Sequence, residues 1–180
     1  MQEIGKHEEI ISPWVTLVAR TVASSSGGQV AVYHSIKQSD YVGVLAVTKD
    51  GEIPLVRQYR PACGGVTLEL PSGLMEAGET PEQCARRELA EEVGLEVEEL
   101  RLRRLGVLRP DTGRLENRLW CFFASDARPI PGWHPEMNVE PQRVSREQLM
   151  QAIAEGRFDH ALHVAVVGLA VMGGLFQIHV

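Results

Sequence analysis

The segment from Thr80 to Gly94 carries both a start signal and a stop signal for an α-helix. Thr80 is a typical N-cap residue, proline follows at the first helical position, and glutamine stands three residues after the cap. Gly94 stands where a glycine in the left-handed conformation commonly ends a helix. The sequence therefore predicts a helix over Pro81–Val93.

Three glutamates of this segment, Glu88, Glu91 and Glu92, lie at i, i+3 and i+4 and so share one helix face. Like charges at this spacing repel, and a further glutamate, Glu79, stands just before the helix. Carboxylate oxygens are preferred ligands of Mg²⁺ and Mn²⁺, and bound cations would remove the repulsion. Three glutamates alone are more typical of a solvated acidic face. The residues around them must decide between the two interpretations.

The rest of the chain is dominated by β-rich runs separated by turn signals. Strands are expected at Val15–Ala23, Val30–Ile36, Tyr41–Thr48, Ile53–Tyr59, Val66–Leu70, Leu100–Leu108 and Leu119–Ala124. The first two should form a hairpin, and Asp50-Gly51 predicts a tight turn that pairs Ile53–Tyr59 with Tyr41–Thr48.

Further helices are expected from Ser145 to about Glu155 and over Ala161–Leu175, while the proline-containing stretch Pro129–Pro141 should be a loop or a broken strand. Few helices among many strands favour an α+β sandwich over a parallel βαβ array.

Composition and patterning exclude several classes of protein. Eighteen basic and twenty-four acidic residues give a net charge of −6, which argues against binding to a nucleic-acid backbone. The N-terminal residues lack the apolar core of a secretory signal, and the apolar run Val164–Phe176 is too short for a membrane span. Cys63, Cys84 and Cys121 form no C-x-x-C pair, which favours reduced thiols in a cytoplasmic protein.

The glutamates belong to a longer pattern of fixed spacing. It reads G, five residues, E, seven residues, R-E, an aliphatic residue, one residue, E-E, one residue, G and an aliphatic residue. Its positions are filled by Gly73, Glu79, Arg87, Glu88, Leu89, Glu91, Glu92, Gly94 and Leu95. This pattern matches the Nudix box at every fixed position, so the chain resembles the Nudix hydrolases.

The resemblance implies an α/β/α sandwich of mixed sheets in which the box forms a loop, a helix and a loop. Nudix enzymes hydrolyse a nucleoside diphosphate linked to another group, with Mg²⁺ or Mn²⁺ held by the box glutamates. Carried over, Glu88 and Glu92 would be the main metal ligands, Glu91 a supporting ligand and the carbonyl of Ser72 a further one. Arg87 would orient the glutamates, and Glu79 would brace the loop.

The flanking residues resemble one branch of the family, the ADP-ribose and ADP-sugar pyrophosphatases. That branch has a Q-[YF]-R-P segment followed by an E-[LF]-P-[AS]-G-L lead-in to the box, as in Gln58–Pro61 and Glu69–Leu74 here. Pro110, sixteen residues after Gly94, is a further marker of the branch.

Candidate substrate-binding residues follow from this resemblance. Trp14 and Tyr33 offer aromatic faces for adenine, and the guanidinium groups of Arg57 and Arg60 suit diphosphate oxygens. Leu74, beside the box glycine, and Asp111, in the turn after Pro110, complete the expected set. Trp14 and Tyr33 are equally consistent with hairpin residues, and Arg57 with a solvent-facing strand residue.

The catalytic base of this branch is usually a glutamate in a loop well after the box. Here that loop is roughly residues 130–139, which offers Glu136, with Glu140 as the second choice and His134 as a weaker one. The proline-rich sequence around Trp133 departs from the acidic loop common in the branch, so the base and the substrate stay open.

The resemblance predicts a Mg²⁺-dependent (or Mn²⁺-dependent) hydrolase that converts ADP-ribose or a related nucleotide sugar to a nucleoside monophosphate and a sugar phosphate. The alternatives are a GDP-mannose or other nucleotide-sugar hydrolase, a nucleotide sensor without turnover, and a protein adaptor with an acidic helix. Residues 1–39 should form a β subdomain that joins two subunits into a homodimer, and residues 40–180 the Nudix domain. No nucleic-acid or membrane partner is expected.

Overall fold

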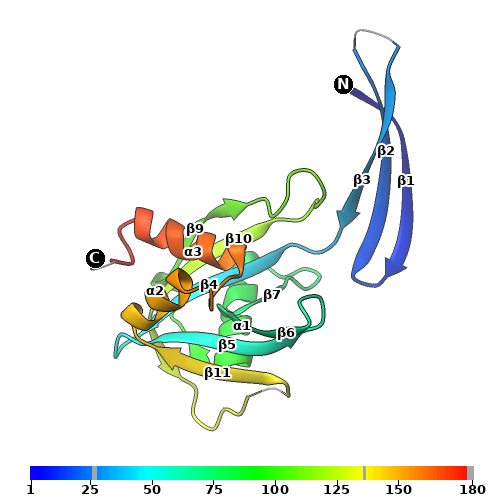
Figure 1. Cartoon of the computed structure of the whole chain (residues 1–180). Helices are drawn as coiled ribbons and strands as arrows, with labels where there is room; N and C mark the ends of the chain where they lie inside the picture. Colours follow the sequence, from blue (N-terminus) through cyan, green and yellow to red (C-terminus); the bar gives the residue numbers. More distant parts are fainter. Residues whose placement is uncertain (26–27, 136, 178–180) are drawn as a thin grey trace. The chain divides into compact units, whose positions relative to one another are not determined.

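The computed structural model describes residues 1–25, 28–135 and 137–177 (Figure 1). The chain divides into two compact units. The first combines Met1–Asp40 with Arg109–Arg118, and the second combines Tyr41–Leu108 with Leu119–Val180. The segment 109–118, which the sequence assigned to the Nudix domain, thus belongs to the same compact unit as the N-terminal strands.

The first unit is an antiparallel sheet of three strands, β1 (Gln2–Ser12), β2 (Val15–Ala23) and β3 (Val30–Lys37), in the order β1-β2-β3. The expected hairpin of β2 with β3 is confirmed. β1 was not predicted, because its charged residues interrupt the apolar alternation that marks a strand. Segment 109–118 attaches to β3 through a bridge between Leu115 and Ile36, and Glu116 forms an ion pair with Arg20 of β2.

The second unit contains a mixed sheet in the order β7-β4-β10-β8, with β9 also paired to β10. Its strands are β4 (Tyr41–Thr48), β7 (Ser72–Leu74), β8 (Leu95–Glu96), β9 (Leu102–Leu108) and β10 (Leu119–Pro129). β4 and β10 run parallel, whereas β7, β8 and β9 are antiparallel to their neighbours. β9 starts two residues later than expected because a 3-10 turn, η1 (Glu99–Arg101), precedes it. β10 continues into the stretch expected to be a loop.

The second sheet of this unit has the order β11-β5-β6, formed by β5 (Ile53–Arg60), β6 (Gly65–Glu69) and β11 (Val139–Val144). The prediction that β4 and β5 pair as a hairpin is wrong. The Asp50-Gly51 turn does form, because Gly51 N–H donates to the Thr48 carbonyl at 3.0 Å. Both edges of β4 are occupied by β7 and β10, however, so β5 passes into the other sheet.

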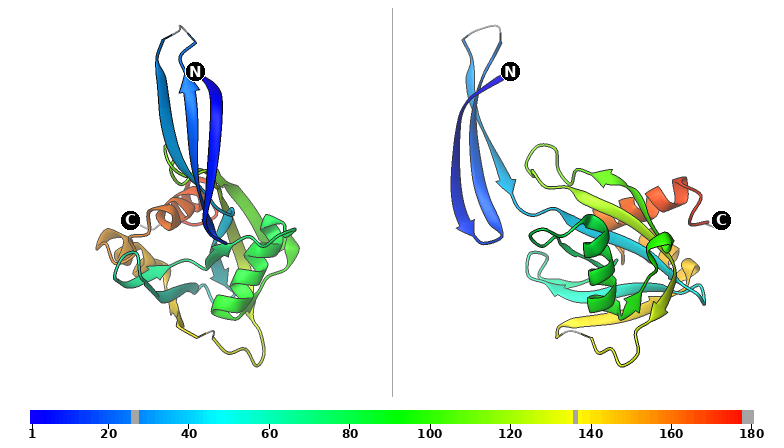
Figure 2. Two further views of the ribbon diagram at one scale, coloured as in Figure 1. Left: turned by 90° about the vertical axis from the view of Figure 1, so that its right-hand side faces the viewer. Right: turned by 180° about the vertical axis from the view of Figure 1, so that it is seen from behind.

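Three helices cover these sheets, α1 (Pro81–Val93), α2 (Arg146–Ala154) and α3 (Ala161–Met172) (Figure 2). The predicted cap of α1 is confirmed: Thr80 Oγ1 accepts a hydrogen bond from Gln83 N–H at 3.2 Å. α2 has the same capping box at Ser145. α3 ends at Met172 instead of Leu175, where two glycines follow. Among the described residues no helix is both long and apolar enough to cross a membrane.

Two hydrophobic clusters fix the position of α1. Val44 and Ala46 of β4 pack in one cluster with Leu89 of α1, whereas Leu45 packs in the other cluster with residues of α2 and α3. This alternation follows from the period of two in a strand. α1 therefore lies on one face of the central sheet, and α2 and α3 lie on the other (Figure 2).

Candidate active site

The glutamates of α1 share a helix face but not an environment. Glu88 and Glu92 are buried, with 7% and 8% of their surface exposed, whereas the Glu91 side chain is 43% exposed. Glu92 Oε2 accepts a hydrogen bond at 2.9 Å from the backbone N–H of Ser72, which begins β7. The helix thus turns two carboxylates toward the glycine-bearing loop that precedes it.

Arg87 holds this group of carboxylates together. Its Nη1 donates to Glu88 Oε1 at 2.7 Å and to Glu91 Oε2 at 2.9 Å, and its Nε donates to Glu79 Oε1 at 2.9 Å. Its Nη2 also reaches the carbonyl of Leu74 at 3.0 Å. One guanidinium therefore ties the helix to the loop.

Burial makes the two inner carboxylates costly to ionise. It raises the pKa of Glu92 to about 8, against the hydrogen bond from Ser72, and it raises the pKa of Glu88, against the positive charge of Arg87. Gly73 leaves the space that Glu88 occupies, because a Cβ at that position would lie 2.0 Å from Glu88 Oε1. Arg87 shares its single charge among Glu79, Glu88 and Glu91, so an ionised pair of Glu88 and Glu92 would carry more negative charge than Arg87 balances, which suits a hard divalent cation.

A second ion pair lies close to this group. Arg60 of β5 donates through Nε and Nη2 to both oxygens of Glu69, at 2.8 and 2.7 Å. Glu69 is 1% exposed. Burial raises its pKa, but hydrogen bonds from Arg60 and Thr67 outweigh burial and lower the pKa to about 2. Glu69 therefore stays ionised and fixes the Arg60 guanidinium, and the charge of Arg60 in turn lowers the pKa of Glu92.

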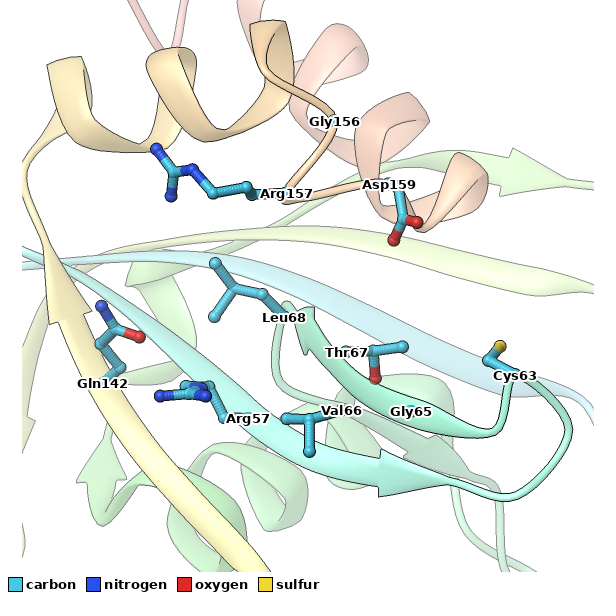
Figure 3. Close-up of a pocket in the computed structure, with 10 residues that line it drawn as sticks. All are labelled: Arg57, Cys63, Gly65, Val66, Thr67, Leu68, Gln142, Gly156, Arg157 and Asp159. Carbon is cyan, nitrogen blue, oxygen red and sulfur yellow. The ribbon is translucent and has the colours of Figure 1, made fainter.

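Arg57 lies on the other face of the same sheet. Val56 packs with α1, whereas Leu55 packs with α2 and α3, so Arg57 shares the face of Leu55. There it lines a cavity of about 630 Å³ with Gln142 and Arg157 (Figure 3). Arg57 and Arg60 therefore do not converge on one point within this chain, although both were expected to clamp the diphosphate.

The side chain of the second candidate base, Glu140, points to the face of the sheet opposite α1, because its neighbour Val139 packs in the cluster that contains α1. Glu140 pairs with Arg57 across β11 and β5, and its Oε2 is 4.0 Å from Arg57 Nη1. The sheet therefore separates Glu140 from Glu88 and Glu92, which the linear sequence could not indicate. The first candidate, Glu136, lies outside the described residues.

The remaining candidates divide between the two units. Leu74, in β7 of the second unit, is 43% exposed beside the box glycine. Trp14 and Tyr33 belong to the first unit and are 67% and 53% exposed, so neither is a core residue of this chain. Asp111, also in the first unit, closes a turn in which its Oδ1 accepts from Gly113 N–H at 2.7 Å.

Sequence reasoning gave no role to His163 or to Glu69. Together with His160 these residues bring possible metal-ligand atoms within 4.8 Å of one another. The two imidazoles are stacked, with centroids 3.8 Å apart and planes at 16°, so their in-plane lone pairs do not converge. Both oxygens of Glu69 already accept from Arg60. This group therefore fits a cation less well than the carboxylates of α1.

A capped helix that carries buried glutamates, follows a glycine loop and lies against a mixed sheet is typical of the Nudix class of domain. The family model for the NUDIX domain matches residues 37–163 of the chain. This chain belongs to the Nudix family.

Relatives and solved structures agree with this assignment. The chain is 30% identical to the ADP-ribose pyrophosphatase of Mycobacterium tuberculosis over 80% of its own length and 74% of that protein. It is 37% identical to the ADP-sugar pyrophosphatase of Mus musculus over 50% of its length and 49% of the relative. The match spans only 35% of a Caenorhabditis elegans relative. The crystal structure of an ADP compounds hydrolase shares the fold, with a TM-score of 0.80, 22% identity, and coverage of 96% and 95% of the two chains.

Proposed function

We propose that this chain is a metal-dependent pyrophosphatase that hydrolyses ADP-ribose, or a related nucleoside diphosphate sugar, to a nucleoside monophosphate and a sugar phosphate. The observation that carries the proposal is the pair of buried carboxylates, Glu88 and Glu92, facing the glycine loop of a Nudix box. Relatives from Mycobacterium tuberculosis and Mus musculus are an ADP-ribose and an ADP-sugar pyrophosphatase.

The residues that would hold Mg²⁺ or Mn²⁺ are Glu88, Glu92, Glu91 and the carbonyl of Ser72. Their oxygen donors suit either ion, and the raised pKa of Glu92 supports a site that gains from a cation. When bound, such an ion neutralises diphosphate charge and stabilises the leaving oxygen.

The side chains of the site have separate tasks in this proposal. Arg87 keeps Glu88 and Glu91 oriented through its hydrogen bonds. Arg60 is the candidate for contact with the diphosphate, because Glu69 fixes its guanidinium while 43% of the Arg60 side chain stays exposed. A guanidinium held in this way keeps donors available for phosphate oxygens at little entropic cost.

The proton of the attacking water needs an acceptor within hydrogen-bond reach. Glu136 is the acceptor that we propose, because Glu140 faces away from α1 and is close to Arg57. Replacing Glu136 by glutamine should lower kcat while leaving Mn²⁺ affinity unchanged. The same change at Glu140 serves as the matched control and should leave kcat near the parent value.

The first unit supports a homodimer. Exposed apolar residues of its strands include Ile4, Ile10, Val30, Val32 and Tyr33. Apolar surface of this extent on a small sheet is unfavourable in water, and a second copy of the chain would cover it. Trp14 and Tyr33 would then be available to stack on adenine at the subunit interface. Sedimentation that finds only a 20 kDa monomer at micromolar concentration would contradict this part of the proposal.

A cytoplasmic location is part of the same proposal. It is supported by the cysteines Cys63, Cys84 and Cys121, which are all free thiols.

The experiment that tests the function is a substrate panel with product identification. ADP-ribose, other ADP-sugars and GDP-mannose are incubated with the protein and Mg²⁺, and in parallel with chelator. We expect AMP and ribose phosphate from ADP-ribose, and no turnover with chelator. Faster cleavage of GDP-mannose than of ADP-ribose would contradict the proposed substrate and favour a GDP-mannose hydrolase. Binding of ADP-ribose without cleavage would favour a nucleotide sensor.

A further inference from the structure

Three consecutive residues at the start of β7 are hydrogen-bonded through their backbone to three different elements. Leu70 N–H donates to His163 Nδ1 of α3 at 3.1 Å. The Pro71 carbonyl accepts from Val44 N–H of β4 at 3.0 Å. Ser72 N–H donates to Glu92 Oε2 of α1 at 2.9 Å. The only side chains among these partners are those of His163 and Glu92. The backbone that leads into Ser72 is therefore hydrogen-bonded to a residue from the far end of the chain.

His163 is built as a fixed acceptor. It is 1% exposed, and its ring stacks on His160, whose Nδ1 accepts the backbone N–H of His163 at 3.4 Å. Burial, with a contribution from His160, lowers the pKa of His163 to about 3, so the ring is neutral. With Nδ1 accepting from Leu70, the single ring proton belongs on Nε2.

The bond to His163 satisfies a donor that otherwise has no access to water. Leu70 is fully buried, and an unpaired N–H at such a position is unfavourable. Without the acceptor, the backbone at Leu70 must move to find another partner. Pro71 and Ser72 follow directly in the chain, so that movement would reach the loop that faces Glu88 and Glu92.

We propose that His163 is a positioning residue for the metal site: by accepting the Leu70 N–H, it keeps Ser72 and Glu92 in the arrangement that a shared divalent cation requires. This inference rests on the proposed function for its metal, and it adds a residue of α3 to a site otherwise built from β5, β6, β7 and α1. His163 contacts neither the metal nor the substrate.

Four variants distinguish the loss of the hydrogen bond between Leu70 and His163 from the loss of packing around His163. His163→Asn keeps an acceptor near the position of Nδ1, whereas His163→Leu has almost the same shape as asparagine and no acceptor. His163→Phe keeps a ring that can stack on His160 but also lacks the acceptor. His160→Ser removes the stacking partner while retaining an N-cap residue.

Mn²⁺ affinity is measured by electron paramagnetic resonance, without substrate and well below each variant's melting temperature. We expect the leucine and phenylalanine variants to bind Mn²⁺ roughly tenfold or more weakly than the parent. The asparagine variant and His160→Ser should stay close to the parent. Equal Mn²⁺ affinity in parent, leucine and phenylalanine variants would overturn the proposal, and so would an asparagine variant as weak as leucine.

A measurement on the parent protein keeps the inference testable if the variants fold poorly. Nitrogen-15 NMR of the imidazole should find the proton of His163 on Nε2, and a proton on Nδ1 would exclude the bond and overturn the inference. Turnover of ADP-ribose by the parent separates the two proposals. A parent that binds Mn²⁺ with the expected dependence on His163 but leaves ADP-ribose intact would refute the substrate alone.

Discussion

Replacing Glu92 by glutamine should remove a destabilising effect of alkaline pH on the metal-free protein. Glu92 is 8% exposed, and burial raises its pKa from a usual 4.5 to about 8. A folded-state pKa above the unfolded value means that the folded protein holds this proton more tightly. The stability that this proton gives is complete below about pH 4.5 and is lost as the pH rises through about 8.

The expected size follows from that shift. Between about pH 6 and about pH 9 the parent should lose roughly 2–3 kcal/mol of unfolding free energy through Glu92. This is an upper limit, because water that reaches the ionised group reduces the cost. Glutamine is neutral throughout, and its amide oxygen can still accept the Ser72 N–H. The stability advantage of Glu92→Gln over the parent should therefore grow over this pH range.

The assay is urea unfolding followed by tryptophan fluorescence in buffer with EDTA. Glu91→Gln is the matched control, because it makes the same substitution on the same helix at a side chain that is 43% exposed. Added Mg²⁺ or Mn²⁺ should stabilise the parent and have much less effect on Glu92→Gln. A stability difference between Glu92→Gln and the parent that is constant from about pH 6 to about pH 9 would refute the reasoning.

Three further changes test other parts of the site. Gly73→Ala places a Cβ 2.0 Å from Glu88 Oε1, so the affinity for Mn²⁺ should fall by roughly tenfold or more. Gly106→Ala is the control, because its Cβ meets nothing closer than 3.8 Å, and this variant should bind Mn²⁺ as the parent does in the same titration. Thr80→Ala removes the N-cap of α1 and should lower the free energy of unfolding in urea by about 1 kcal/mol, whereas Thr80→Ser should stay close to the parent. An unchanged unfolding midpoint for the alanine variant would count against a stabilising cap. Trp14→Ala should raise KM for ADP-ribose and leave kcat nearly unchanged, since loss of base stacking is worth roughly 1–3 kcal/mol; an unchanged KM would remove Trp14 from the substrate site.

Local signals predicted local structure well. α1 begins at Pro81 and ends at Val93 as expected, because its capping box and its C-terminal glycine involve only neighbouring residues. The pairing of β5 was predicted wrongly although the Asp50-Gly51 turn was identified. Which edge a strand joins depends on the edges that other strands have already occupied, and the sequence around the turn carries no such information.

In the candidate site too, local features could be predicted from the sequence, whereas features that depend on tertiary packing could not. The spacing predicted that Glu88, Glu91 and Glu92 share a face, but only the packing of α1 distinguishes the two buried carboxylates from the exposed one. The bond between His163 and Leu70 spans 93 residues and has no sequence signal. The opposite directions of Arg57 and Arg60 were available from the period of two in a strand, since the residues are three apart.

The most direct test of the site is a crystal structure of the protein soaked in Mn²⁺, with anomalous data collected on both sides of the manganese absorption edge. We predict an anomalous peak bounded by the carboxylates of Glu88 and Glu92 and the carbonyl of Ser72. Full soaking that leaves this position empty, or a peak found only beside Glu69, His160 and His163, would contradict a metal centre on α1.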